Sequence, residues 1–313
     1  MIRYCFYRIL MAVPVLVGIS LLAFALGLLS PGDPAEFALN QNGLDAPTEA
    51  QLAEMREELG LNCPVYVQYL AWMEQVLQGN LGSSYISGRD ILQELLLRLP
   101  VTAELAVLAL ALAAVVGIVA GVLCAVYKDS TLDRLLQLVT NIMLAVPGFW
   151  LALLMILLFS ETLRWLPTSG SGSLRHFVLP ALAVSLSTAA TVCRYMRSSL
   201  LQEFAAQYFT IARVRGLGRA RLLFSYALPN ALLPVIALLG NYFAGILGGS
   251  VIAESIFALP GISSMALEAI RLRDYPVLQA YVLFTGWLLV VITLLVDVLM
   301  LRLNPKLQAG DGR

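Results

Sequence analysis

The sequence predicts an all-α fold, a polytopic membrane protein with six transmembrane helices, and its composition and apolar segments carry that prediction. Apolar residues make up 59% of the chain and charged residues only 13%, which is too apolar a balance for a soluble domain of this length. A helix needs about 20 mostly apolar residues to cross the hydrocarbon core of a bilayer. The segments that meet this requirement are 9–29, 101–127, 135–160, 177–200, 230–253 and 279–303.

The first apolar segment predicts an N-terminal transmembrane helix within residues 1–30. Arg3 and Arg8, followed by an apolar run and by Ala23-Phe24-Ala25, also resemble a secretory signal with a small-residue cleavage site. The apolar run continues to Leu29, which favours a helix that is retained. Either alternative leaves the other five spans in the same orientation.

Residues 31–99 are the one long polar segment, and their pattern predicts an extracytoplasmic helical loop. Thr48 followed by Gln51 is a capping-box signal, and Gly60 is a typical stop for the helix that begins there. A second helix with an apolar face is predicted from Pro64 to Gly79. Helices this short bury little by themselves, so we expect them to lie against the spans or against an extracytoplasmic partner.

The rest of the chain divides into a five-helix core, residues 100–303, and a cytoplasmic tail, residues 304–313. Residues 91–99 mix leucines with charges, which predicts a short interfacial helix that ends where Pro100 starts the second span. Small residues inside the spans let helix backbones approach closely where lipid provides no hydrophobic drive. Such positions include Gly117, Gly121 and Gly240.

Positive charge predicts the orientation of the spans. If the N-terminus is cytoplasmic, only seven of the 20 basic residues fall outside: Arg56, Arg89, Arg98, Arg164, Arg175, Arg271 and Arg273. Cytoplasmic loops carry the excess of Lys and Arg in membrane proteins, so both termini are predicted to be cytoplasmic. The net charge of zero, without a basic patch interleaved with aromatics, gives no indication of nucleic-acid binding.

Several chemistries find no support in the sequence. The cysteines offer no same-side pair for a disulfide, and the single histidine cannot supply a histidine-based metal site. No Gly-x-x-x-x-Gly-Lys-Ser/Thr phosphate-binding motif or catalytic constellation is present, so we predict that the chain is not an enzyme. A self-sufficient secondary transporter or channel is the alternative, but such proteins place ionisable sites near the membrane midplane. Here only Asp297 lies well inside a span, near its cytoplasmic end, where we expect it to pair with a neighbouring helix.

The cytoplasmic stretch at about 203–229 has the sharpest local pattern in the chain. Four arginines surround the sequence Gly216-Leu217-Gly218, with apolar residues on either side. A glycine between two amphipathic segments permits a sharp turn through positive φ, which predicts a helix-turn-helix knob. A basic loop that binds anionic lipid headgroups is the alternative interpretation.

The spacing of this stretch resembles the coupling loop with which ABC importer permeases contact their ATPases. The family's loop starts Glu-Ala-Ala, has a glycine four residues later and ends Ile-x-Leu-Pro. Ala212, Gly216, Leu228 and Pro229 fall on that register, whereas Thr210, Ile211 and Tyr226 replace the usual Glu, Ala and Ile. The resemblance implies that the ATPase-coupling residues are Thr210, Ala212, Arg213, Arg215, Gly216, Leu217, Leu228 and Pro229.

Short motifs along nearly the whole chain resemble the first of the two membrane subunits of dipeptide, oligopeptide and nickel importers. They include Pro31-Gly32-Asp33-Pro34, Gly79-Asn80-Leu81-Gly82, Arg98-Leu99-Pro100 and Pro147-Gly148-Phe149-Trp150. The family places the loop at about 254–276 in a re-entrant segment that faces the binding protein. The resemblance implies that an outer gate or binding-protein contact is formed by Glu254, Phe257, Pro260, Gly261, Arg273 and Asp274. A plain outer hairpin is the alternative.

The resemblance implies a type I ABC importer permease in the bacterial cytoplasmic membrane. Its partners would be a homologous second permease subunit in a heterodimer, two ABC ATPase subunits, an extracytoplasmic substrate-binding protein and membrane lipid. The chain would hold no cofactor, because ATP and Mg²⁺ would be bound by the ATPase subunits, and it would work by alternating access. The substrate stays open between nickel, a metal chelate and a di- or oligopeptide. Some motifs lean towards nickel permeases, but no His or Cys cluster offers a bare metal soft ligands.

Overall fold

The computed structural model describes residues 2–29, 33–41 and 47–303, which fold as helices joined by short loops. The predicted tail, 304–313, and Pro31 and Gly32 of the first family-like motif lie outside the described residues. The chain forms two compact units. The first unit is Met1–Arg8, Val101–Pro260 and Leu289–Arg313, and the second unit is Ile9–Pro100 and Gly261–Leu288.

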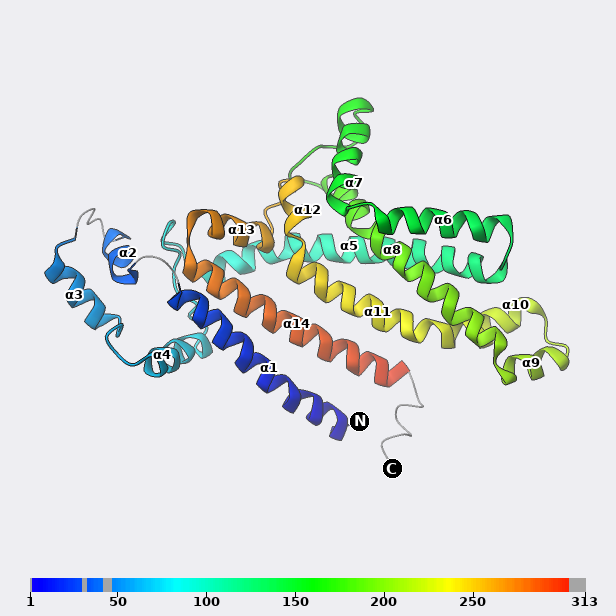
Figure 1. Ribbon diagram of the computed structural model, residues 1–313, viewed down its shortest axis with the longest axis horizontal. Helices are drawn as coiled ribbons and strands as arrows, with labels where there is room; N and C mark the ends of the chain where they lie inside the picture. The colour runs from blue at the N-terminus through cyan, green and yellow to red at the C-terminus, as the bar shows by residue number, and fades with distance from the viewer. Residues whose placement is uncertain (1, 30–32, 42–46, 304–313) are drawn as a thin grey trace. The chain divides into compact units, whose positions relative to one another are not determined.

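Long helices account for about half of the described chain, and Figure 1 labels them. They are α1 (Ile2–Leu28), α5 (Ile91–Val126), α8 (Leu174–Ala205), α11 (Leu228–Gly249) and α14 (Tyr275–Leu303). The shorter helices are α2 (Pro34–Gln41), α3 (Glu49–Glu58), α4 (Val65–Leu77), α6 (Thr131–Ala145), α7 (Gly148–Met155), α9 (Gln207–Val214), α10 (Arg219–Arg221), α12 (Val251–Ile256) and α13 (Ile262–Leu272). Two π-helical segments are η1 (Ile156–Thr162) and η2 (Leu222–Ala227).

The polytopic all-α prediction is confirmed, with one predicted span broken. Within the described residues, five helical segments are long and apolar enough to cross a membrane: Tyr7–Leu28, Ile91–Val126, Leu174–Ala205, Arg219–Gly249 and Tyr275–Arg302. The predicted span 135–160 is instead the pair Thr131–Ala145 and Gly148–Thr162, which is bent by 101° and counts as a sixth span if taken together. Pro147 explains the break, because the residue before a proline is driven out of the helical region. Val146 accordingly has an extended ψ of 129° and ends α6.

The predicted helix break at Pro100 is wrong. Residues 91–99 and the second span form one helix of 36 residues, with Pro100 inside it. A proline within a helix removes one backbone hydrogen bond without preventing the helix from continuing when tertiary packing stabilises both sides. Leu95 before the proline and Leu105 after it are both fully buried.

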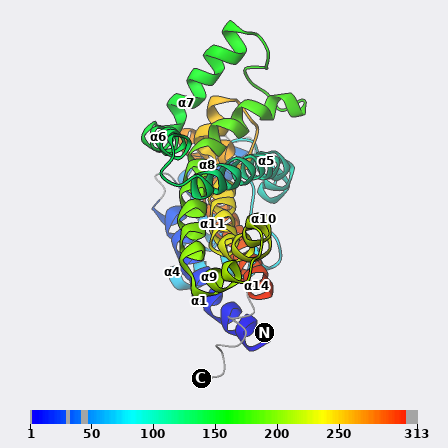
Figure 2. The same ribbon diagram turned by 90° about the vertical axis from the view of Figure 1, so that its right-hand side faces the viewer.

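The first unit is organised around α8, which packs against both α6 and α11 (Figures 1 and 2). Helix α5 also approaches α8 closely, through two glycines. A Cβ atom added to Gly117 would lie 2.7 Å from the carbonyl oxygen of Ala189, and one added to Gly121 would lie 2.7 Å from that of Cys193. No side chain fits at such distances, so the close helix packing predicted at these glycines is confirmed for this seam.

The second unit contains the polar segment, and its local signals are confirmed. Thr48 and Gln51 form the reciprocal capping box at the start of α3, and Gly60 follows that helix with a φ of +67°. The second predicted helix is α4. The hydroxyls of Tyr69 on α4 and Ser20 on α1 lie 2.8 Å apart, so α4 packs against a span, as one of the two alternatives predicted.

Candidate functional site

The predicted knob forms as α9, a turn at Gly216 and the short α10. Gly216 has a φ of +83°, and its N–H donates to the carbonyl oxygen of Arg213 at 3.0 Å. The next N–H, of Leu217, reaches the carbonyl of Ala212 at 3.4 Å, which closes the end of α9 in the manner of a left-handed helix cap. A Cβ at Gly216 would meet nothing within 4 Å. The turn therefore needs glycine for its backbone conformation and not for space.

One face of the knob is fixed to the first unit. Ala212 is only 7% exposed, and Leu222 and Ala227 of η2 are buried beneath it. The rings of Phe209 on α9 and Phe204 on α8 have centroids 5.1 Å apart, and both belong to the apolar cluster around the ends of α8 and α11. Because interiors packed in this way deform little, a displacement of α9 is transmitted to α8 and α11.

Polar contacts add to this anchoring. The hydroxyl of Tyr208 on α9 donates to the carboxylate of Glu203 on α8, and the side-chain amide of Asn230 on α11 reaches the Tyr208 hydroxyl at 3.4 Å. Burial, and then the hydrogen bond to Glu203, raise the pKa of Tyr208 above its usual value. Tyr208 therefore stays neutral and keeps its role as a donor at physiological pH.

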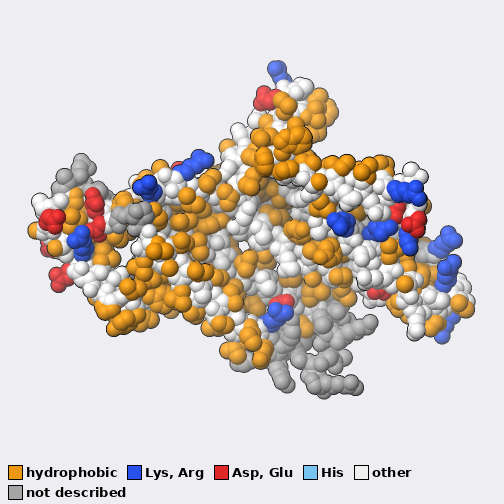
Figure 3. Space-filling model, in the orientation of Figure 1, with side chains coloured by type: hydrophobic (Ala, Val, Ile, Leu, Met, Phe, Trp, Pro, Cys, Tyr) orange, Lys and Arg blue, Asp and Glu red, His pale blue; other side chains and the backbone are white. Residues whose placement is uncertain are grey.

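The opposite face of the knob is solvent-exposed and mixes apolar and basic groups. Val214 is 83% exposed and Ile211 is 54% exposed. The predicted coupling residues Thr210, Arg213, Arg215 and Pro229 are also exposed, whereas Leu217 and Leu228 are half-buried and Ala212 is buried. Figure 3 shows basic side chains gathered around the α9 and α10 end of the first unit. The exposed face has the mixture of apolar and arginine side chains that is enriched in protein interfaces.

A buried ion pair that the sequence did not predict joins α6 to α8. The guanidinium of Arg197 binds the carboxylate of Asp133 with two contacts, Nε to Oδ1 at 2.9 Å and Nη2 to Oδ2 at 2.8 Å. The side-chain amide of Gln137 and the backbone N–H of Asp129 also donate to Asp133, which is 1% exposed. The pair therefore locks the start of α6 to the half of α8 that leads into the knob.

Between the same two helices lies a cavity of about 940 Å³, which we call the polar groove. Its lining is Gln137, Thr140, Asn141 and Leu144 from α6 with Thr191, Arg194, Tyr195, Arg197, Ser198, Leu201, Gln202 and Ala205 from α8. Most of these side chains are polar although both helices belong to candidate membrane spans. The sequence analysis did not single out this groove, because its residues are divided between segments that lie about 50 positions apart.

The predicted outer segment is largely buried on the first-unit side. Glu254 is fully buried, and its Oε1 accepts hydrogen bonds from the hydroxyls of Thr102 at 2.8 Å and Ser250 at 2.6 Å. Phe257 is 1% exposed, and its carbonyl accepts the N–H of Gly170 at 3.1 Å. Both residues stabilise the fold of the first unit, and neither offers a surface to a partner in this conformation.

On the second-unit side of the outer segment, the neighbouring charged residues Arg273 and Asp274 differ in burial. Asp274 is 5% exposed and accepts from the Ser84 hydroxyl at 2.5 Å and the Tyr85 N–H at 3.1 Å. Arg273 is exposed and ends α13 with a left-handed φ of +58°. Gly261 is the buried N-cap of α13, so of the six predicted outer residues only Pro260 and Arg273 lie on the surface.

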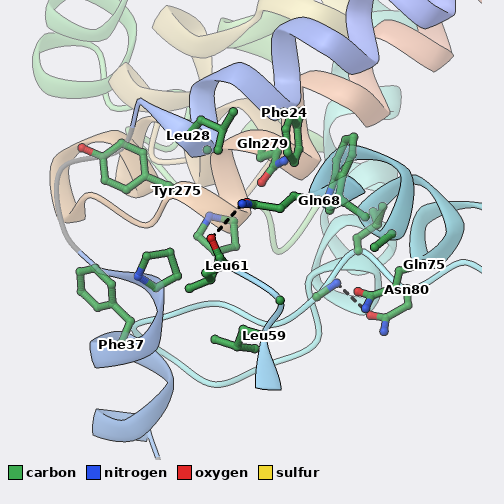
Figure 4. Close-up of a pocket in the computed structure, with 18 of the residues that line it drawn as sticks. Phe24, Leu28, Phe37, Leu59, Leu61, Gln68, Gln75, Asn80, Tyr275 and Gln279 are labelled. Carbon is green, nitrogen blue, oxygen red and sulfur yellow. Dashed lines mark hydrogen bonds between the residues drawn. The ribbon is translucent and has the colours of Figure 1, made fainter. Parts of the chain in front are cut away.

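The second unit also has a pocket of about 460 Å³ between the end of α1, α4 and the start of α14. Figure 4 shows Phe24, Gln68, Tyr275 and Gln279 around it. Most of the described lining residues have apolar, aromatic or amide side chains, Cys63 adds a thiol and Ser83 a hydroxyl, and none of them is charged. The Gln68 amide is already bound to the Leu61 carbonyl at 3.0 Å.

One further predicted feature concerns the charged residue inside the last span. Asp297 forms an ion pair with Arg8 at 3.1 Å, which confirms the predicted pairing with a neighbouring helix. Among the described residues there is no group of three or more His, Cys, Asp and Glu side chains that could hold a metal ion.

Comparison with known proteins places these features in a family. Residues 117–309 match the family described as binding-protein-dependent transport system inner membrane component, and residues 1–106 match the N-terminal part of such membrane components. A putative peptide permease protein of Brucella suis is 35% identical, over 98% of this chain and 99% of the relative. The glutathione transport system permease protein of Escherichia coli K12 is 33% identical, with the same coverage.

Solved structures support the same fold. The inward-facing MetNI methionine ABC transporter matches with a TM-score of 0.58 and 16% identity, over 67% of this chain and 96% of that chain. An amino acid ABC transporter matches with a TM-score of 0.52 and 17% identity, over 67% of this chain and 94% of that chain. The chain belongs to the inner-membrane permease components of binding-protein-dependent ABC importers, a family that implies ATPase and binding-protein partners.

Proposed function

We propose that this permease subunit forms half of the translocation pathway for a small peptide in an ATP-driven importer. The observation that carries the substrate class is the match along the whole chain to permeases named for peptide and for glutathione transport, at 35% and 33% identity. Both names denote peptide-type substrates, so a di- or oligopeptide is favoured over the nickel or metal-chelate alternative. The other half of the pathway is a homologous second subunit, in a heterodimer.

We further propose that both termini and the knob are cytoplasmic and that residues 31–99 and the outer segment face outwards. The excess of basic residues on the proposed inner segments supports this orientation. Ile211, Val214 and Arg215 then form the surface on which an ATPase subunit binds, with the basic residues at the rim. A lipid-binding loop would not require the rigid attachment through Phe209 and Tyr208.

The geometry supports a mechanical link from this surface to the spans. ATP-driven closure of the ATPase subunits would move α9, and the packing of Phe209 against Phe204 would carry that movement into α8. The ion pair between Asp133 and Arg197 makes α6 follow α8. A contact change at one face of the membrane is thereby converted into reorientation of the helices that line the pathway, which is the requirement of alternating access.

On the outer side, we propose that Arg273 and Pro260 contact the binding protein. Arg273 is the exposed charged member of the predicted set, and Arg is enriched where proteins bind each other. Glu254 and Asp274 instead hold the outer segment in shape through their buried hydrogen bonds.

The proposal is tested by reconstituting the complete importer in proteoliposomes. With the binding protein outside and ATP inside, we expect uptake of a labelled peptide and none with a non-hydrolysable nucleotide. Uptake that persists without the ATPase subunits would instead support the self-sufficient transporter alternative. Faster uptake of free nickel than of peptide would contradict the substrate class.

The orientation is tested independently with fused reporters. A cytoplasm-active reporter placed after Arg219 should be active, and one placed at Gly43, which lies outside the described residues, should be silent. The reverse pattern would overturn the topology.

A further inference from the structure

The polar groove between α6 and α8 does not match a surface that faces lipid. Its lining includes Asn141, Arg194, Ser198 and Gln202, all exposed, on helices that belong to candidate membrane spans. Polar and ionisable side chains within spans are costly in lipid and are found facing the protein interior or a water-filled cavity. Such a groove therefore does not suit contact with lipid but suits a space that holds water or a polar ligand within the assembled importer.

The two arginines of the groove differ in whether a carboxylate neutralises the guanidinium. Arg197 is neutralised by the two contacts to Asp133, as described above. Arg194 is exposed in the groove, and the ion pairs of the described part of the chain do not include it. Arg194 thus provides a guanidinium whose charge is available to an anion.

The position of Arg194 places the groove at the cytoplasmic end of the pathway. The residue lies on α8 about 16 Å before Ala205, where the helix ends next to the knob, at a rise of about 1.5 Å per residue. The α6 side of the groove starts at Gln137, less than two turns after the helix begins at Thr131. With the knob in the cytoplasm, the groove opens on the inner side of the membrane.

The remaining groups of the groove suit a peptide. Asn141 and Gln202 offer amides that can both donate to a carbonyl and accept from an N–H. Gln137 donates its amide to Asp133 at 2.7 Å, which leaves its carbonyl oxygen for a ligand. The volume of about 940 Å³ is at the upper end of the roughly 300–1,000 Å³ typical of ligand sites.

We propose that the polar groove is the cytoplasmic half of the substrate path and that Arg194 binds the free carboxylate of the transported peptide. A guanidinium matches a carboxylate with two parallel hydrogen bonds, and such charge-assisted contacts are stronger than neutral ones. The inference rests on the proposed function, since it names how the same importer recognises its substrate. It assigns to this chain a selectivity for ligands that carry a carboxyl group.

The test measures whether a peptide occupies the groove. In inside-out vesicles that contain the complete importer, Ser198→Cys is labelled from the cytoplasmic side with a neutral, membrane-impermeant maleimide. Tyr195→Cys is a second reporter position, since Tyr195 lines the groove and is 51% exposed. Leu138→Cys is the control. Leu138 is 56% exposed on α6 but lies outside the groove, where we expect it to face lipid and not water. The unsubstituted complex gives the background from the native cysteines.

We expect both groove cysteines to be labelled and the Leu138→Cys variant to stay at background. A peptide should slow the labelling. The same peptide with its C-terminus amidated should need about tenfold higher concentration for equal protection, as the loss of one charged hydrogen-bonding partner predicts. In an Arg194→Ala background the peptide and the amide should protect equally, whereas Arg134→Ala, at an exposed position outside the groove, should leave the difference intact.

Failure of the groove cysteines to react would overturn the proposal, since lipid or a partner subunit then fills the groove. Protection that is the same for peptide and amide, or that survives Arg194→Ala, would overturn the role of Arg194. Uptake by the unsubstituted importer is measured in parallel. If peptide uptake is intact while protection fails, the inference is wrong and the proposed function stands, whereas absence of peptide uptake contradicts the proposed function itself.

Discussion

The turn at Gly216 permits a matched comparison of two glycines in one loop. Gly216 has a φ of +83°, whereas Gly218, two residues later, has a φ of −63°. A Cβ at either position would meet nothing within 4 Å, so substitution by alanine tests the backbone conformation alone. A left-handed conformation costs a residue with a side chain about 1–2 kcal/mol, which corresponds to a roughly 5- to 30-fold lower population of the native turn. Gly218→Ala carries no such cost.

The assay follows from the proposed role of the knob. Purified importers with Gly216→Ala or Gly218→Ala are compared for retention of the ATPase subunits during dilution and for ATP-dependent peptide uptake. We expect Gly216→Ala to weaken retention and uptake by about the same 5- to 30-fold factor and Gly218→Ala to match the unsubstituted importer. Equal behaviour of the two variants would refute the argument that the shape of this turn presents the ATPase-binding surface.

Three further predictions concern other parts of the chain. Asp133→Ala leaves Arg197 partly buried without its partner and should cost about 3–5 kcal/mol, which thermal unfolding of the purified complex would reveal; an unchanged melting temperature would contradict the structural role of the pair. Arg273→Ala should lower uptake stimulated by the binding protein while the complex stays intact. Asp274→Ala should instead reduce the yield of folded complex, because it loses buried hydrogen bonds that contribute about 1–3 kcal/mol. Lower uptake with an intact complex for Asp274→Ala, and a lower yield for Arg273→Ala, would show that Asp274 is the contact. Ala258→Gly should stabilise the complex by about 1 kcal/mol, since Ala258 has a φ of +48°, and a lower melting temperature would disprove that its backbone is strained.

The sequence predicted those parts of the fold that depend on local physics. The apolar segments predicted the spans, and Thr48, Gln51 and Gly216 predicted a helix start and a turn that the structure confirms. At Pro147 and Pro100 the helices differ from those predicted. Pro147 breaks a predicted span, and Pro100 lies inside a helix that it was expected to start. The effect of a proline depends on how its surroundings are packed, and that packing is not local information.

The candidate sites likewise divide into features set by local sequence and features set by contacts between distant segments. The knob was predicted in position and shape because its spacing lies within about 20 residues. Glu254 and Asp274 were expected at an outer gate or binding-protein contact because of the family resemblance. Each is instead buried and accepts a hydrogen bond from a hydroxyl distant in the chain, that of Thr102 and that of Ser84 respectively. The polar groove likewise requires α6 and α8 to be brought together, and no local pattern indicates that they are.

The seam of Gly117 and Gly121 against α8 limits which substitutions this protein can accept during evolution. Even one methyl group at either position would meet a backbone carbonyl of α8 at 2.7 Å, and a carbonyl in a helix cannot turn aside as a side chain can. Apart from Gln137 and Arg197, which bind Asp133, the side chains that line the neighbouring groove can be replaced without a clash of this kind. In the proposed substrate groove, specificity can therefore change by small sequence steps along α6 and α8, while the glycine seam between α5 and α8 tolerates none.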